Sequence, residues 1–229
     1  MKNFADTSIK TYNECTKNVN PELKKYVEEK IFPVYNKNEK AHDINHINYV
    51  IRRSFELIKQ NNLNVNTDIV FAIAAYHDIG HYIDSKKHEL VSADMMYKDG
   101  NLKKYFSNEE RIIIKEAIED HRASSDHEPR SLYGKIVSSA DRNNTVEQCL
   151  ERSYYYGKKL DPSATELELH KRAFKHLNLK FGQNGYAKFF LNDSEYESFL
   201  TNIRKILKDE KEFCKIQANY IKKIENKEN

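Results

Sequence analysis

The chain has 229 residues, of which 39% are hydrophobic and 32% charged, a composition typical of a soluble, helix-rich globular protein. Only 6 glycines and 4 prolines leave little material for the many tight turns of a sheet protein. The 38 basic and 35 acidic residues are interspersed, and their net charge of +3 argues against a nucleic-acid-coating surface, so we predict no stable nucleic-acid partner.

Amphipathic segments bounded by capping residues predict an all-α fold. The expected helices cover about residues 21–35, 44–59, 67 to near Gly80, 87–97, 108–121, 132–142 and 146–158. Asn20-Pro21 and Asn66-Thr67 are typical helix starts, and Ser107 with Glu110 predicts a capping box.

The C-terminal part predicts two further helices, one from Asp161-Pro162-Ser163 and a long one from Asn192-Asp193-Ser194 to about Glu225. Apolar residues recur along the long helix at steps of three and four, interrupted by Glu210 and Gln217. We interpret it as packing on its own domain, with a dimerising helix, and so a homodimer, as the alternative. We expect a single domain over residues 1–229, with a core at about 40–160 and a helical extension at about 161–229.

Several polar side chains continue the apolar stripes of the predicted helices and should therefore face the core. They are His46, His77, Asp78, His88, His121 and Asp141. A buried carboxylate is costly unless its charge is compensated, and no matching set of inward-facing lysines or arginines is visible. A metal ion would compensate it, because imidazole and carboxylate are common ligands and helix bundles often build metal sites from inward-facing positions.

The order of these residues resembles that of HD-domain metal-dependent phosphohydrolases, in which a lone histidine, a His-Asp pair and a distant aspartate lie on successive helices. The resemblance spans about residues 41–145 and is carried by the stretches AHDINHINYVIRR, AAYHDIGH, KHELVSADMM, AIEDHRAS and KIVSSADRNN. It implies an HD-domain helical bundle over this range, and the long amphipathic helix predicted from the apolar spacing follows it toward the C-terminus.

The resemblance also implies one or two divalent transition-metal ions (Mn, Fe, Co, Ni or Zn). The minimal set for one ion is His46, His77, Asp78 and Asp141. As in binuclear members, His88 and His121 would hold a second ion, with Asp78 bridging the two. The chain departs from several binuclear members in having Arg122 where they have a second consecutive histidine.

The implied reaction is hydrolysis of a phosphate mono- or diester, with a small phosphorylated molecule such as a nucleotide as substrate. Two metal ions would activate water and clamp the phosphoryl oxygens. Besides Asp78, we expect Arg122 and Arg142 to stabilise developing charge, and His81 to orient water or protonate the leaving group. His42 lies one turn before His46 and is expected to support it.

Two other classes of function stay open at this point. One is a di-iron oxygenase of the HD type, and the other is a non-catalytic signalling module that a metal only stabilises. The chain has no P-loop, GxGxxG motif or nucleophile elbow, which argues against kinases, dehydrogenases and serine hydrolases.

The location is predicted from the cysteines and from the absence of apolar runs. Cys15, Cys149 and Cys214 are far apart and form no disulfide framework, which favours a reducing compartment. No window approaches 18 apolar residues, and the first residues lack the apolar region of a signal peptide. We therefore expect a cytoplasmic protein that does not enter a membrane.

Overall fold

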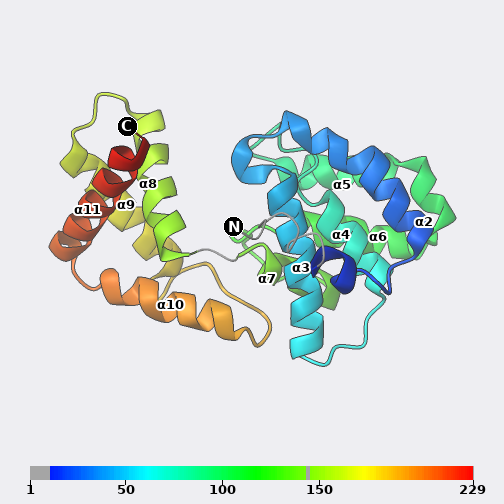
Figure 1. Cartoon of the computed structure of the whole chain (residues 1–229). Helices are drawn as coiled ribbons and strands as arrows, with labels where there is room; N and C mark the ends of the chain where they lie inside the picture. Colours follow the sequence, from blue (N-terminus) through cyan, green and yellow to red (C-terminus); the bar gives the residue numbers. More distant parts are fainter. Residues whose placement is uncertain (1–10, 143–144, 229) are drawn as a thin grey trace. The chain divides into compact units, whose positions relative to one another are not determined.

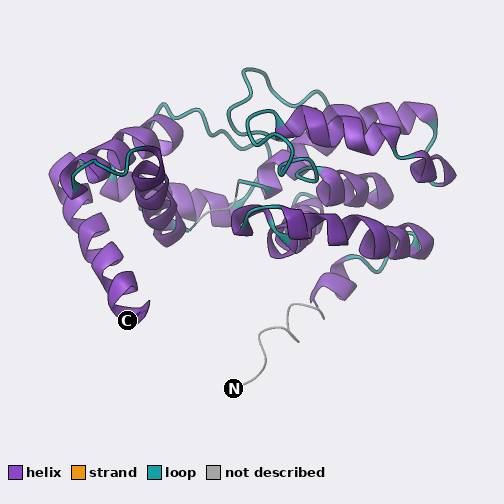
Figure 2. Cartoon of the chain, turned by 90° about the horizontal axis from the view of Figure 1, so that it is seen from above, coloured by secondary structure: helices purple, strands orange, loops and turns teal. Residues whose placement is uncertain are grey.

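The computed structural model describes residues 11–142 and 145–228, and this part of the chain consists of helices and loops without strands (Figure 2). The predicted all-α fold is confirmed. Within the described residues, no helix combines the length and apolar character needed to cross a bilayer.

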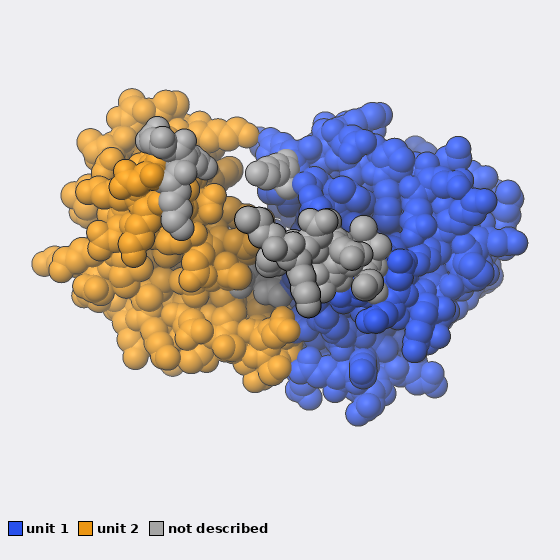
Figure 3. Space-filling model, viewed as in Figure 1, with its two compact units in different colours: residues 1–141, 189–192 blue, residues 142–188, 193–229 orange. Residues whose placement is uncertain are grey.

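The chain divides into two compact units (Figure 3). The N-terminal unit comprises Met1–Asp141 with Phe189–Asn192, and the C-terminal unit comprises Arg142–Lys188 with Asp193–Asn229. The expected organisation as a single domain, with a core at 40–160 and an extension at 161–229, stays a prediction.

The N-terminal unit is built around one helix that is apolar on every side. Its helices are α2 (Pro21–Tyr26), α3 (Ile44–Gln60), α4 (Thr67–Tyr76), α5 (His88–Lys98), α6 (Asn108–Glu119) and α7 (Leu132–Ala140) (Figure 1). Every α4 residue from Ile69 to Tyr76 is buried, and α3, α5, α6 and α7 all pack against this helix. A helix that is hydrophobic all round has no solvent face, so it occupies the centre of its unit.

The first predicted helix, 21–35, is only partly correct. α2 ends at Tyr26, a π-helical turn η1 covers Val27–Ile31, and a 3-10 helix η2 covers Phe32–Lys37. Pro33 explains the change, because proline lacks the N–H and its ring clashes with the preceding turn of an α-helix.

The helix starts predicted at Asn66 and Ser107 are confirmed, whereas the start predicted at Asp161-Pro162-Ser163 is wrong, because that helix begins at Glu166, where Thr165 and Glu168 form a capping box. Asn66 accepts a hydrogen bond from the backbone N–H of Asp68, and Ser107 and Glu110 form both bonds of a capping box. Asp43 caps α3 by accepting hydrogen bonds from the backbone N–H groups of Asn45 and His46, at 2.8 and 3.2 Å. This cap fixes His46 in the first turn of α3.

Gly80 does not end α4, contrary to the prediction, because the helix stops at Tyr76 and a series of turns follows. Its role is to allow close approach of α5. A Cβ atom at this position would lie 2.6 Å from Cγ1 of Val91 and 2.9 Å from the backbone nitrogen of Ser92. The Gly80 N–H also donates to the Ser92 hydroxyl at 2.9 Å.

The C-terminal unit contains α8 (Val146–Leu160), α9 (Glu166–Phe181), α10 (Ser194–Ile206) and α11 (Glu210–Glu228). The predicted helix from 192–194 to about Glu225 is therefore two helices, of which α11 is the long C-terminal amphipathic one. The helix is interrupted near Asp209. The carboxylate of Asp209 accepts a hydrogen bond from the Glu212 N–H at 2.8 Å and so caps the start of α11. The apolar stripe nevertheless continues across the break, since Leu207 is buried.

Gln217 interrupts that stripe because it belongs to a buried polar network. Its Oε1 lies 2.8 Å from Nδ1 of His170 on α9, and its Nε2 donates to the Leu150 carbonyl at 2.8 Å and the Ser153 hydroxyl at 3.0 Å on α8. The ring of Tyr154 stacks on His170 with centroids 5.3 Å apart. One glutamine thus connects three helices of this unit.

Candidate metal centre

The predicted ligands lie where helices of the N-terminal unit begin and end. His46 is in the first turn of α3, and His88 is the first residue of α5. The others come directly after helices: His77 and Asp78 after α4, His121 after α6, and Asp141 after α7. Because α4 is buried on all sides, the residues that follow it are buried too, with His77 at 0% and Asp78 at 1% exposure.

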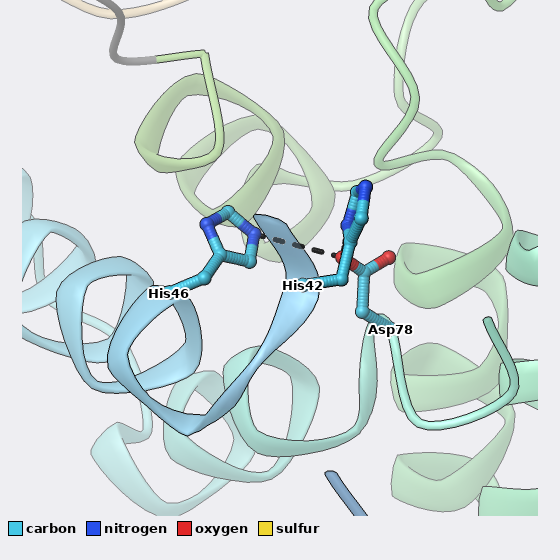
Figure 4. Close-up of side chains that lie close together, drawn as sticks. All are labelled: His42, His46 and Asp78. Carbon is cyan, nitrogen blue, oxygen red and sulfur yellow. Dashed lines mark hydrogen bonds and ion pairs between the residues drawn. The ribbon is translucent and has the colours of Figure 1, made fainter. Parts of the chain in front are cut away.

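Asp78 is the centre of the cluster. Its Oδ2 lies 2.6 Å from Nδ1 of His42, 3.6 Å from Nε2 of His46 and 3.5 Å from Nε2 of His77. Figure 4 shows the rings of His42 and His46 directed toward this carboxylate. Its other oxygen, Oδ1, faces a different pair of histidines, so the two oxygens of one carboxylate divide the cluster into two halves.

The first half joins three elements. Nε2 of His46 lies 3.1 Å from Oδ1 of Asp141, and Nε2 of His77 lies 3.8 Å from the same oxygen. The two imidazole nitrogens are themselves 3.3 Å apart. These three residues with Asp78 are the set expected to hold one ion, and the structure brings all four together.

The second half contains the two further histidines. Nε2 of His88 lies 3.2 Å from Asp78 Oδ1, and Nε2 of His121 lies 3.5 Å from the same oxygen. These two nitrogens are 3.2 Å apart. The structure therefore brings all six predicted residues into one cluster.

The hydrogen bonds of the histidines determine which nitrogen faces the centre. Nδ1 contacts the carbonyl three residues earlier in His77 (Ala74, 2.8 Å), His88 (Ser85, 3.1 Å) and His121 (Ile118, 2.6 Å). A neutral imidazole has one proton, so a proton on Nδ1 leaves a lone pair on Nε2.

The cluster consequently contains lone pairs that face one another and the carboxylates. Among the described residues, none satisfies the buried Oδ1 of Asp78 with a hydrogen bond. Lone pairs that face one another repel and are unfavourable without a cation. Imidazole and carboxylate groups are the usual ligands of divalent cations, which would remove this repulsion. The donor set therefore fits a metal centre.

The titration behaviour shows how strongly the groups interact. Burial lowers the pKa of His46, but Asp141 and Asp78 raise it to about 10. Burial lowers the pKa of His77 to about 4 despite the nearby carboxylates. Burial alone would raise the pKa of Asp78, but the charges and hydrogen bonds of the surrounding histidines, His77 foremost, hold it well below its usual range. A proton on His46 therefore occupies the position in which the proposed cation would bind.

His42 is a closer member of the cluster than the sequence predicted, since it contacts Asp78 itself as well as preceding His46. Its spacing of four residues from His46 was the available signal. The His42 ring also stacks on His81, with centroids 3.9 Å apart and an angle of 19°. His81 is half-buried beside the centre, and burial together with His42 lowers its pKa to about 4.

Asn38 is a contributor that the sequence analysis missed. Its amide donates to the carbonyls of His42 and Asp78, each at 3.0 Å, and accepts from the Tyr82 N–H at 3.0 Å. One side chain thus fixes the backbone of two cluster residues. The contact with His42 is local, but those with Asp78 and Tyr82 span 40 and 44 residues, so the sequence around Asn38 does not indicate them.

The two arginines expected at the site have different surroundings. Arg122 directs Nη1 to the Lys86 carbonyl at 2.6 Å and to the Glu89 carboxylate at 3.2 Å. Arg142 is buried and belongs to the C-terminal unit, where its charge acts on Tyr196. Their catalytic roles stay predictions.

A pocket of about 700 Å³ opens beside the second half of the cluster. Its position is known from two residues of its lining, Glu89 and Arg122, which directly follow His88 and His121 in the sequence. Its lining consists of Glu89, Leu90, Glu119, Asp120, Arg122, Ser124, Ser125, Asp126, His127, Glu128 and Arg130.

Comparison with known families agrees with this geometry. Residues 42–144 match the family described as HD domain, and this range includes His42 and all six predicted ligands. Comparisons with curated proteins and with solved structures give no match. The segment 42–144 therefore resembles an HD domain, and this agrees with the cluster of histidines and aspartates that it contains.

Proposed function

We propose that the chain is a metal-dependent phosphohydrolase that cleaves a phosphate mono- or diester of a nucleotide or a similar small molecule. The observation that carries the proposal is the buried Asp78 carboxylate, which separates two groups of imidazole nitrogens within an HD domain. HD domains belong largely to metal-dependent hydrolases, and this centre has the donor chemistry that such a reaction needs.

The proposed ligands divide between two ions. His46, His77 and Asp141 would hold the first, His88 and His121 the second, and Asp78 would contribute one oxygen to each. Divalent ions of Mn, Fe, Co, Ni or Zn lower the pKa of a bound water toward about 7 and polarise a phosphoryl oxygen.

The chain's own residues have separate tasks in this proposal. The carboxylates of Asp78 and Asp141 offset positive charge in the buried centre, and the α4 core excludes water behind it. His81 is half-buried beside His88, with ring centroids 5.2 Å apart, and in this proposal it would orient water or protonate the leaving group. A guanidinium, from Arg122 or Arg142, would stabilise charge on the phosphoryl oxygens.

The proposal also includes where the protein acts and with which partners. The three cysteines Cys15, Cys149 and Cys214 are free, which supports a reducing compartment such as the cytoplasm. The proposed partner is a small phosphorylated substrate, and a homodimer stays a prediction.

The test is metal loading followed by a phosphate-release screen over nucleoside mono-, di- and triphosphates and cyclic dinucleotides. We expect release that requires the ion and is abolished by Asp78→Asn. Asp94→Asn, a change at a side chain that is 55% exposed and does not line the pocket, is the matched control and should keep full activity.

Two outcomes would contradict the proposal. Full metal occupancy with no release of phosphate or cleavage of a diester across the panel would favour a module that the metal only stabilises. Tightly bound iron in a mixed-valent state, with no hydrolysis, would favour an oxygenase.

A further inference from the structure

Arg122 forms a bridge between the two segments that carry His88 and His121. It directly follows His121, and its Nη1 donates to the Lys86 carbonyl at 2.6 Å and to both Glu89 oxygens, at 3.3 and 3.2 Å. Its partners at 86 and 89 therefore lie on either side of His88 in the sequence.

The bridge restricts the distance between His88 and His121, which the other contacts of these two histidines leave variable. Each ring is oriented toward its own backbone by an Nδ1 contact, to Ser85 or to Ile118. What remains variable is the distance between the segments, and the Nε2 atoms that face each other are 3.2 Å apart. Arg122 restricts this distance, because its backbone belongs to the segment of His121 while its Nη1 is held by acceptors on both sides of His88.

The charge of the pair matters as well. Arg122 next to a cation site would disfavour the ion by repulsion, and Glu89 offsets that charge at 3.2 Å. The side chains are only 34% and 15% exposed, so this pair is less screened than an ordinary surface pair. Glu89 also lies 3.9 Å from Nδ1 of His88.

We propose that Arg122 is a positioning residue that, together with Glu89, sets the spacing of His88 and His121 and thereby the affinity for a second metal ion. The inference rests on the proposed function only as far as the metal centre, because it concerns ion binding and needs no substrate. It assigns to Arg122 a task different from direct contact with the phosphoryl group.

The two roles predict different behaviour of Glu89. A guanidinium that only contacts substrate would be needed for turnover with both ions bound, and loss of Glu89 would leave ion binding unchanged. A bridge requires both partners. Removing either one should weaken the second ion by a similar factor, and removing both should weaken it little further, as for residues that act as one unit.

The experiment is equilibrium dialysis of the metal-free, full-length chain against Mn²⁺, with elemental analysis of the bound ion. We expect two ions for the wild type. Arg122→Gln and Glu89→Gln should each weaken the second ion by about 10- to 100-fold, the range seen when outer partners of metal ligands are changed. The first ion should bind as in the wild type, and Arg122→Lys should restore part of the loss.

Arg52→Gln is the matched control. It removes an ion pair with Glu56 of similar exposure, 32% and 31%, that lies next to no proposed ligand. This variant should bind both ions normally. Thermal melting of all metal-free variants checks that none has lost its fold.

Three results would overturn the inference: wild-type affinity for the second ion in both variants, an effect of Arg122→Gln without one of Glu89→Gln, or a wild type that binds one ion only. Failure of the proposed function is a separate result. A chain that shows the expected ion binding but neither releases phosphate nor cleaves a diester would refute the phosphohydrolase and leave the positioning role of Arg122 intact.

Discussion

Removal of the metal should lower the melting temperature of the N-terminal unit. The proposed ligands come from segments that begin or end helices, so the first ion would tie α3, α4 and α7 together and the second would tie α4, α5 and α6 together. Without the ion, the lone pairs around Asp78 face one another, and protons or water must take its place.

The size of the effect follows from mass action. An ion that binds only the folded chain stabilises it by about 2.7 kcal/mol when its free concentration is about 100 times its dissociation constant. One kcal/mol shifts the melting temperature of a domain of roughly 150–250 residues by about 2–4 °C. One ion should therefore contribute about 5–11 °C, and two ions about twice as much.

The assay is thermal melting of fully stripped protein against protein reloaded with Mn²⁺, Co²⁺, Ni²⁺ or Zn²⁺ at neutral pH. Asp94→Asn should show the wild-type shift, and Asp78→Asn should show almost none. His88→Ala should retain only the part due to the first ion. Identical melting curves of stripped and reloaded wild type, with removal verified by elemental analysis, would refute the view that these residues share an ion.

Three further predictions use other parts of the structure. Because the pKa of His46 is about 10 without metal, ion binding should release a proton, and calorimetry in buffers of different ionisation enthalpy should show affinity rising from neutral pH toward that value. Without the ion, the stability from His46 is fully present below about pH 6.5 and is lost as pH rises through 10, which denaturant titrations can follow; a flat profile would contradict it. Gly80→Ala should destabilise by about 1–3 kcal/mol, since the new Cβ meets Val91, whereas Gly100→Ala, with nothing within 4 Å, should be close to neutral in the same denaturation assay. Gln217→Leu leaves buried partners unsatisfied, at about 1–3 kcal/mol each, and should destabilise the C-terminal unit without changing metal content.

The elements that the sequence predicted well depend on local chemistry. The Ser107–Glu110 capping box involves groups three residues apart, and both of its bonds are present. The central position of α4 also follows from local composition, because a segment without a polar face can only be buried. Such features need no knowledge of the rest of the fold.

The helix predictions that were wrong concern places where another backbone structure competes with the α-helix, and apolar periodicity does not reveal this competition. The apolar stripe continues from α10 into α11 through Leu207, so spacing alone predicts one helix. The break depends on Asp209, whose carboxylate offers the backbone an alternative to continuing the helix. The helix at 21–35 ends early although the segment is amphipathic, because Pro33 cannot occupy the interior of an α-helix without losing a hydrogen bond.

The site shows the same division between local and distant information. That polar residues on apolar stripes converge could be predicted, because each of them had to lie inside. Their partners could not: the amide of Asn38 contacts carbonyls at His42 and Asp78, and neighbouring residues give no sign of it. For Arg122, adjacency to a ligand suggested a side chain directed at the substrate, but adjacency in sequence does not fix direction.

The histidines that follow helices deserve a different interpretation from interruptions of a stripe. The last carbonyls of an α-helix have no partner within the helix. His77 lies close to the Ala74 carbonyl at the end of α4, and His121 lies close to the Ile118 carbonyl at the end of α6. Each ring thereby donates from Nδ1 to a carbonyl at the end of a helix and directs the lone pair of Nε2 into the centre. A histidine that follows a buried helix is thus oriented by the end of that helix. This is why an apolar segment that ends in His-Asp can direct its ligand atoms into a buried metal centre.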